Sequence, residues 1–103
     1  MNVNAYDFIA IDFETANDSR DSACQIGITT VKNGQIKDVK SWLINPESYF
    51  NSFNTMIHGI TEKDVKDKPT FSELWPEISP YFGNEGKHSI NSPFYSKNVM
   101  LLL

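Results

Sequence analysis

The dipeptide Asn33-Gly34 constrains the fold of this chain more than any other short feature of its sequence. Asparagine and glycine readily adopt positive φ angles, which the tight two-residue turns of β-hairpins require. Side chains alternate in character over residues 24–31, which precede the dipeptide. Residues 36–44 follow it and end before Pro46. We therefore expect two strands joined by a hairpin turn at this point.

A short apolar run at residues 8–13 predicts another strand ahead of this hairpin. The run is almost continuous, which is typical of a strand that is buried on both faces of a sheet. The polar, turn-rich residues 17–22 then predict a loop. Three strands in succession, the last two forming a hairpin, indicate the start of an antiparallel or mixed sheet.

Helices are expected in the second half of the chain, after a loop at residues 45–54. Thr61 can cap the free amide three residues further on, so a short helix should begin there and end at Pro69. Thr70 and Glu73 have the spacing of a capping box, in which each side chain binds the other residue's amide. A second helix should therefore begin directly after Thr70.

This second helix is expected to continue to about Phe82, with apolar residues at helical spacing. Pro76 lies inside it and should kink it or delay its start. Residues 87–91 are then expected to form a short strand and residues 94–103 a final helix. The predicted order is β-β-β-α-α-β-α, in a single α/β domain that covers residues 1–103.

The composition excludes several classes of protein. The chain has 103 residues, 40% of them hydrophobic, which suits one domain with a true core. Its 9 basic and 13 acidic residues argue against binding nucleic acid by a broad basic face, although bound metal ions could offset phosphate charge. Cys24 is alone, so we expect neither a disulfide nor a cysteine-rich zinc site. Without a signal peptide or membrane span, a cytoplasmic protein that does not enter a membrane is expected.

The candidate site is the acidic pair Asp12 and Glu14, at the end of the first apolar run. Residues two apart on a strand point to the same face, about 7 Å apart along the chain. Two such carboxylates repel each other unless a cation lies between them, and oxygen ligands suit Mg²⁺ or Mn²⁺. The structural alternative is a solvated strand end or a cap.

Residues 8–15, FIAIDFET, resemble the first motif of the DEDD-type 3′→5′ exonucleases, a family that includes the epsilon proofreading subunit of bacterial DNA polymerase III. Four further segments resemble the family in the same order along the chain, namely residues 22–27, 44–46, 57–61 and 69–71. The resemblance covers about residues 6–82.

The resemblance implies a ribonuclease H-like fold, a mixed sheet flanked by helices, with two Mg²⁺ or Mn²⁺ ions as cofactors. Asp12 would bind both metal ions and Glu14 one of them. Thr15 would lie near the 3′-terminal nucleotide, and the loop that begins at His58 would line the pocket for it. The alternative for Thr15 is to cap amides of the following loop. The alternatives for His58 are to order its own loop or to stack on another group, and not to act as a metal ligand or base.

The match to the family weakens after residue 82. At the place of the second motif, Asn91 and Phe94 are retained, but Ile90 replaces a histidine and Tyr95 replaces the metal-binding aspartate. The histidine and aspartate of the last motif do not occur before Leu103. The resemblance therefore implies a truncated chain with an incomplete C-terminal part and two of the four expected carboxylates.

Three functions follow from this pattern. The first is a two-metal 3′→5′ exonuclease that acts on a single-stranded 3′ end, does not enter a membrane and has a DNA polymerase subunit as a partner. The second is a catalytically impaired domain that retains binding of nucleic acid or metal. The third is a fragment without a role of its own, which folds poorly and self-associates. Its C-terminal leucines would either cover exposed apolar surface or pair two chains into a homodimer.

Overall fold

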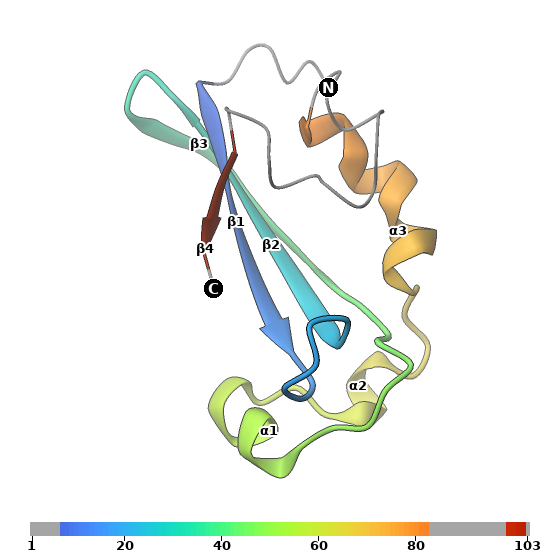
Figure 1. Cartoon of the computed structure of the whole chain (residues 1–103). Coiled ribbons are helices and arrows are strands. Elements are labelled where there is room, and N and C mark those ends of the chain that lie inside the picture. Colours follow the sequence, from blue (N-terminus) through green and yellow to red (C-terminus); the bar gives the residue numbers. More distant parts are fainter. Residues whose placement is uncertain (1–6, 83–98, 103) are drawn as a thin grey trace.

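The computed structural model describes residues 7–82 and 99–102 of the chain. Three strands come first: β1 (Phe8–Thr15), β2 (Ala23–Lys32) and β3 (Gln35–Leu43). Three short helices follow: α1 (Ser52–His58), α2 (Glu62–Val65) and α3 (Phe71–Ile78). The last described element is β4 (Val99–Leu102). Figure 1 shows the strands side by side, with α1 and α2 beyond one end of them.

The four described strands form one mixed sheet in the order β3-β2-β1-β4. Strand β2 runs antiparallel to both β1 and β3, whereas β4 pairs with β1 in parallel. The mixed sheet expected from the sequence is thus confirmed. Because β1 lies between β2 and β4, its backbone is held from both sides.

The hairpin between β2 and β3 is confirmed at the predicted dipeptide. Asn33 has a φ angle of 54° and Gly34 one of 76°, so both residues of the turn have positive φ. This is the backbone conformation of a type I′ turn, for which asparagine followed by glycine is favoured. The two strands extend one residue further than predicted next to the turn.

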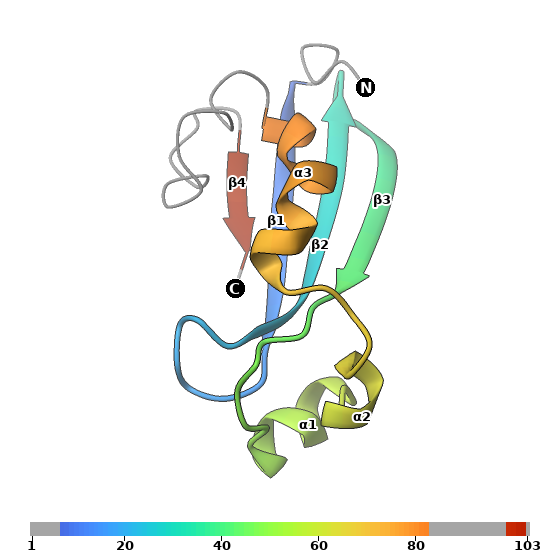
Figure 2. The same cartoon turned by 90° about the vertical axis from the view of Figure 1, so that its right-hand side faces the viewer.

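Strand β1 is buried on one face only. Ile9 and Ile11 are buried, whereas Ala10 is half-buried and Asp12 is exposed. The prediction of a strand buried on both faces is therefore wrong. The reason is the position of the helices: α3 covers one face of the sheet, while α1 and α2 lie beyond the ends of the strands (Figure 2).

Both predicted helix caps are confirmed. The Thr61 hydroxyl accepts a hydrogen bond from the Asp64 amide at 3.3 Å, and the Thr70 hydroxyl accepts one from the Glu73 amide at 3.3 Å. In each case the acidic side chain binds the amide of the threonine in return. Among the described residues, no helix is long and apolar enough to cross a membrane.

Helix α3 completes the main core. Leu74 and Ile78 are buried in one cluster with isoleucines of β1 and β2. The α-helix ends at Ile78, earlier than predicted, and continues as a tighter 3₁₀ turn. Pro76 lies inside the helix and does not delay its start. Pro80 accounts for the early end, because it has no amide hydrogen to continue the helical bonds beyond this point.

Helix α1 was not predicted, because residues 45–54 were expected to form a loop. The helix begins at Ser52, where the Asn51 side chain accepts a hydrogen bond from the Phe53 amide at 2.8 Å. It ends at Gly59, whose φ angle of 78° is the left-handed conformation that favours glycine. The prediction of a loop is therefore wrong from Ser52 onward.

The predicted final helix over residues 94–103 is wrong for its described part. Val99–Leu102 form β4, which pairs with β1 from Ile9 to Asp12. A five-residue apolar run is long enough for a strand but short for a helix, and the edge of β1 offers it backbone partners. Residues 94–98, and the strand predicted at residues 87–91, lie outside the described residues.

Candidate active site

The acidic pair lies near the carboxyl-terminal end of β1. Asp12 and Glu14 are two residues apart on this strand and therefore share one face, opposite to the buried Ile9 and Ile11. Asp12 is exposed and Glu14 is half-buried. The predicted arrangement of two carboxylates on one strand face is present, and metal binding by them stays a prediction.

Strand β2 leaves room beside Asp12. Gly27 is the cross-strand partner of Asp12. A Cβ atom on Gly27 would lie 3.8 Å from the Asp12 carbonyl oxygen and 3.9 Å from the Asp12 Cβ. These are ordinary contact distances, so a side chain longer than alanine would extend into the space next to the carboxylate. Glycine keeps that space open.

Cys24 is a core residue, as predicted, and lies close to the acidic pair. It is fully buried, and its Sγ atom is 3.9 Å from Nε2 of His58. Burial, with a smaller effect from the negative charge of Glu14, raises the pKa of the Cys24 thiol to about 11. The thiol is therefore neutral near pH 7 and is not a ready nucleophile. The ligands that this site offers to a metal are carboxylate oxygens.

The two carboxylates suit a magnesium or manganese ion. Mg²⁺ is commonly bound through one or two carboxylates, with water and substrate phosphates as its remaining ligands. Asp12 and Glu14 supply such a pair of carboxylates. Within residues 7–82 and 99–102, no three His, Cys, Asp or Glu side chains lie close enough together to hold a metal. Within this part of the chain, Asp12 and Glu14 therefore suit a cation whose remaining ligands are water molecules and substrate oxygens.

The end of β1 is held by side chains of α1. The Thr15 carbonyl accepts hydrogen bonds from His58 Nε2 at 2.8 Å and from Asn54 Nδ2 at 3.2 Å. The Ile60 amide donates to His58 Nδ1 at 3.0 Å. Since Nδ1 accepts and Nε2 donates, both ring nitrogens are used within the chain. His58 thus orders its own loop, the alternative role considered above, and substrate binding by Thr15 and His58 stays a prediction.

The loop after β1 is organised by Asn17, not by Thr15. The buried Asn17 side chain donates from Nδ2 to Ser48 Oγ at 2.9 Å and to the Tyr49 carbonyl at 2.7 Å. The Asn17 amide binds Ser22 Oγ at 3.2 Å. The Thr15 hydroxyl instead contacts the Asn54 side-chain amide at 3.4 Å. The alternative in which Thr15 caps loop amides is therefore wrong.

Sequence reasoning missed three residues around the acidic pair: Asn17, Gly27 and Asn54. The spacing of Asn54 and His58, four residues apart, is the one local signal, because such residues share a helix face. It was not used because the segment was expected to be a loop. Gly27 has no local signal in the sequence. Its importance depends on strand pairing, which places it opposite Asp12 of β1.

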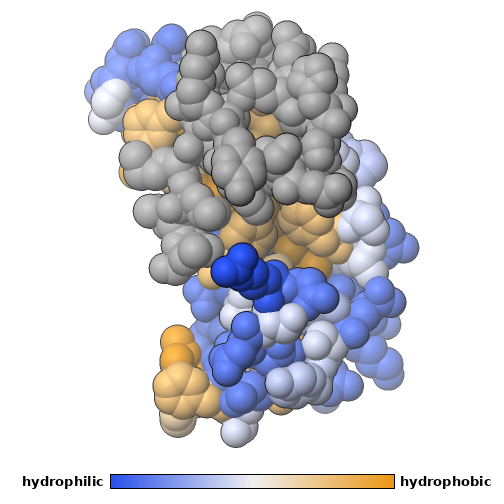
Figure 3. All heavy atoms as spheres, viewed as in Figure 1, coloured by the Kyte–Doolittle hydropathy of each residue, from blue (hydrophilic) through white to orange (hydrophobic). Residues whose placement is uncertain are grey.

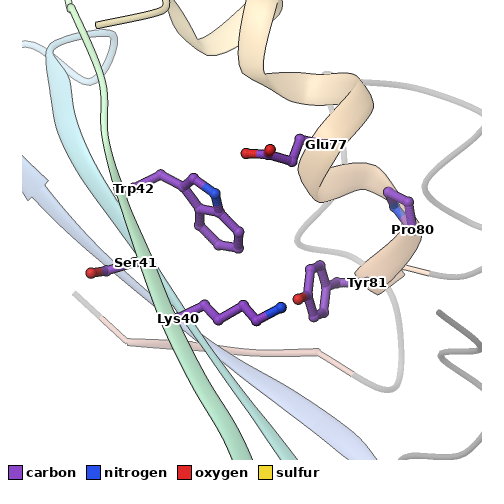
Figure 4. A pocket seen from close by; sticks show the side chains of 6 residues that line it. All are labelled: Lys40, Ser41, Trp42, Glu77, Pro80 and Tyr81. Carbon is purple, nitrogen blue, oxygen red and sulfur yellow. The ribbon is translucent and has the colours of Figure 1, made fainter.

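A hollow of about 490 Å³ lies away from the acidic pair, between β3 and the end of α3 (Figure 4). Its side chains include Lys40, Trp42, Glu77 and Tyr81. The Lys40 ammonium lies 5.9 Å from the centre of the Tyr81 ring. The pKa of Lys40 is raised, mainly by hydrogen bonding to Tyr81. This hollow contains none of the predicted site residues.

The place of the second exonuclease motif lies outside the described residues. This applies to Ile90, Asn91, Phe94 and Tyr95, where the sequence departs from the family pattern. The described part of the site is therefore the acidic pair with the side chains that hold the end of β1.

Comparison with known proteins identifies relatives among nucleases and polymerases. The exonuclease family RNase_T matches residues 9–99. PolC-type DNA polymerase III of Caldanaerobacter subterraneus subsp. tengcongensis is 36% identical over 74 residues, which cover 70% of this chain and 5% of the polymerase. The same type of polymerase from Clostridium perfringens is 28% identical over 100 residues, covering 91% and 7%. The 3′-5′ exonuclease DinG of Bacillus subtilis is 30% identical over 79 residues, covering 74% and 8%.

The chain thus spans between 5% and 8% of the length of these relatives. A solved structure of Exonuclease X in complex with 5′ overhanging duplex DNA superimposes with a TM-score of 0.63 at 30% identity, covering 68% of this chain and 42% of that chain. The likeness confirms the predicted α/β, ribonuclease H-like fold. Because the family match extends over most of the sequence, this chain belongs to the RNase_T exonuclease family.

Proposed function

We propose that this chain is a 3′→5′ exonuclease domain that hydrolyses the terminal phosphodiester of nucleic acid in the cytoplasm and releases a nucleoside monophosphate. The observation that carries the proposal is the position of Asp12 and Glu14. They lie on one face of β1, near its end, within the segment that matches the exonuclease family. Exposed carboxylates on a rigid central strand are suited to bind metal ions that also contact a substrate phosphate.

In this proposal Asp12 would hold both divalent cations and Glu14 would hold one of them. When bound, Mg²⁺ or Mn²⁺ would stabilise the charge on the attacking and leaving oxygens of the phosphodiester. The chain itself contributes a fixed backbone: β1 pairs with β2 at both Asp12 and Glu14, and with β4 as far as Asp12. The cations would also offset the net charge of −4, which otherwise disfavours contact with phosphates.

Thr15 and the loop that begins at His58 are proposed to contact the terminal nucleotide of a single-stranded 3′ end. Both lie at the same end of β1 as the acidic pair, which supports this role. The names of the relatives point to DNA: Exonuclease X was solved with duplex DNA, and two of the relatives above are DNA polymerases. We therefore propose DNA as the substrate and a DNA polymerase as the partner.

The direct test uses single-stranded DNA labelled at either the 3′ or the 5′ end, with the purified 103-residue chain and Mn²⁺. We expect labelled mononucleotide at the earliest times from the 3′-labelled strand, and progressively shortened strands from the 5′-labelled one. Asp12→Asn should abolish both. Asp67→Asn, the same change at an exposed position beyond α2, should leave them intact. Mononucleotide released first from the 5′ end would contradict the proposal.

A second candidate is a domain that binds metal or nucleic acid without hydrolysis. It is favoured by one observation: the described residues bring no third metal-binding side chain to Asp12 and Glu14. In the same experiment, a folded chain that binds Mn²⁺ and DNA but releases no nucleotide would support this candidate over the exonuclease.

A further inference from the structure

Helix α1 turns its apolar side chains outward. Phe53, Met56 and Ile57 are 61%, 74% and 68% exposed, and α1 contains no buried residue. In Figure 3 an apolar patch marks the corner of the molecule where Figure 1 shows α1. A surface helix normally packs its apolar side on the core. Hydrophobic burial therefore does not hold α1 in place.

The polar side of α1 holds it against the end of β1. Asn54 and His58 are four residues apart, so they project from one side of the helix. Both donate hydrogen bonds to the carbonyl oxygen of Thr15, at 3.2 Å and 2.8 Å. A carbonyl oxygen has two lone pairs, and these two donors use both.

The bonded carbonyl follows a break in the sheet. The pairing of β1 with β2 shifts register between Glu14 and Thr15, where a bulge interrupts the regular ladder. Bulges redirect the side chains beside them. The backbone after Glu14 is therefore set by α1 as well as by β2. Two further bonds support the same attachment, from the Asn51 amide to the Ala16 carbonyl at 2.8 Å and from Asn17 Nδ2 to the Tyr49 carbonyl at 2.7 Å.

We infer that Asn54, together with His58, is a positioning residue: by binding the Thr15 carbonyl it fixes the backbone that follows Glu14 and hence the direction of the Glu14 carboxylate. The inference rests on the proposed role of Glu14 as a metal ligand. Groups that orient metal ligands typically change metal affinity or activity by about 10- to 100-fold when they are lost. Asn54 acts through one intervening residue, so a loss near 10-fold is expected.

The test compares Mn²⁺ binding by the full chain and its variants, measured by titration calorimetry without nucleic acid. Asn54→Leu keeps the branching of the side chain at Cγ and removes the donor, and should weaken Mn²⁺ binding about 10-fold. Asn54→Gln keeps the amide on a longer arm and should restore part of the affinity. Ser52→Ala changes an exposed residue of the same helix and should bind Mn²⁺ like the wild type. Thermal unfolding of each variant establishes that it is folded at the temperature of the titration.

Three results would overturn the inference. Wild-type affinity in folded Asn54→Leu would show that the Thr15 bonds do not orient Glu14, while the proposed function would stand. An equal loss in Ser52→Ala would assign the effect to the helix as a whole. Equal Mn²⁺ binding by the wild type and Asp12→Asn would refute the metal site itself, and the positioning role with it.

Discussion

Helices α3 and α1 are attached to the same sheet by different forces. Helix α3 buries Leu74 and Ile78 in the main core, and Trp75 stacks on Phe82 with ring centres 5.4 Å apart. Helix α1 buries no residue and is attached through hydrogen bonds to Thr15 and its neighbours. Burial of one large apolar side chain contributes about 1.5–3 kcal/mol, whereas a hydrogen bond contributes about 1 kcal/mol net.

The difference separates stability from the geometry of the site. Apolar contacts are strong but not directional, so α3 can hold the fold without fixing any one carboxylate. Hydrogen bonds are directional, so α1 can fix the backbone next to Glu14 although it contributes little to global stability. Elements with few buried apolar contacts open locally at lower free energy. The candidate site is thus built beside a helix that buries no residue.

The largest effect should separate two isoleucines, one in each helix. Ile78 is fully buried, so Ile78→Ala should lower the free energy of unfolding by about 3 kcal/mol. Ile57 is 68% exposed, so Ile57→Ala should change it by less than about 0.5 kcal/mol. Urea unfolding followed by circular dichroism measures both. Similar losses in the two variants would contradict the comparison.

A smaller effect is expected from the buried thiol between the sheet and α1. The pKa of Cys24 is raised from 9.0 to about 11, so the folded state binds this proton more tightly than the unfolded state. The stabilisation is complete below about pH 9 and is lost as the pH rises towards 11, by about 2 kcal/mol. Urea unfolding at pH values across this range measures it.

Cys24→Ala is the control for this pH dependence. Tyrosine and lysine side chains titrate in the same range in both proteins, so the difference between the two curves isolates the thiol. An equally steep fall in the alanine variant would mean that Cys24 does not contribute.

The smallest effect should appear at the helix caps. Thr70 caps α3 and Asn51 caps α1, each by accepting a backbone amide hydrogen bond. Thr70→Ala should lower the free energy of global unfolding by about 1 kcal/mol. Asn51→Ala should lower the free energy of global unfolding by only about 0.3 kcal/mol, because α1 can unfold locally while the core stays folded. Thermal or urea unfolding distinguishes them, and a larger loss at Asn51 would reverse the proposed ranking.

Much of the fold follows from local signals in the sequence. The turn at Asn33 and Gly34 requires only the preference of two residues for positive φ, and the caps at Thr61 and Thr70 require only short spacing. Strand β4 was not predictable in this way, because its state depends on pairing with β1, about ninety residues earlier in the chain. Non-local pairing leaves no short-range pattern.

The same contrast applies to the candidate site. Asp12 and Glu14 were predicted because two acids at the end of an apolar run are a local pattern. Asn54 was not, since its contact with Thr15 joins residues 39 apart in sequence. The apolar residues of α1 have the spacing of a helix side that packs on a core. This pattern predicts burial, but the structure leaves these side chains exposed.

Native-state hydrogen exchange tests the division between the two helices most directly. The Leu74 amide, bonded to the Thr70 carbonyl, represents α3, and the Gly59 amide, bonded to the Thr55 carbonyl, represents α1. We predict that Leu74 exchanges only through global unfolding, whereas Gly59 exchanges through local opening at a lower free energy. Equal free energies of exchange at Leu74 and Gly59, both matching global unfolding, would contradict the account.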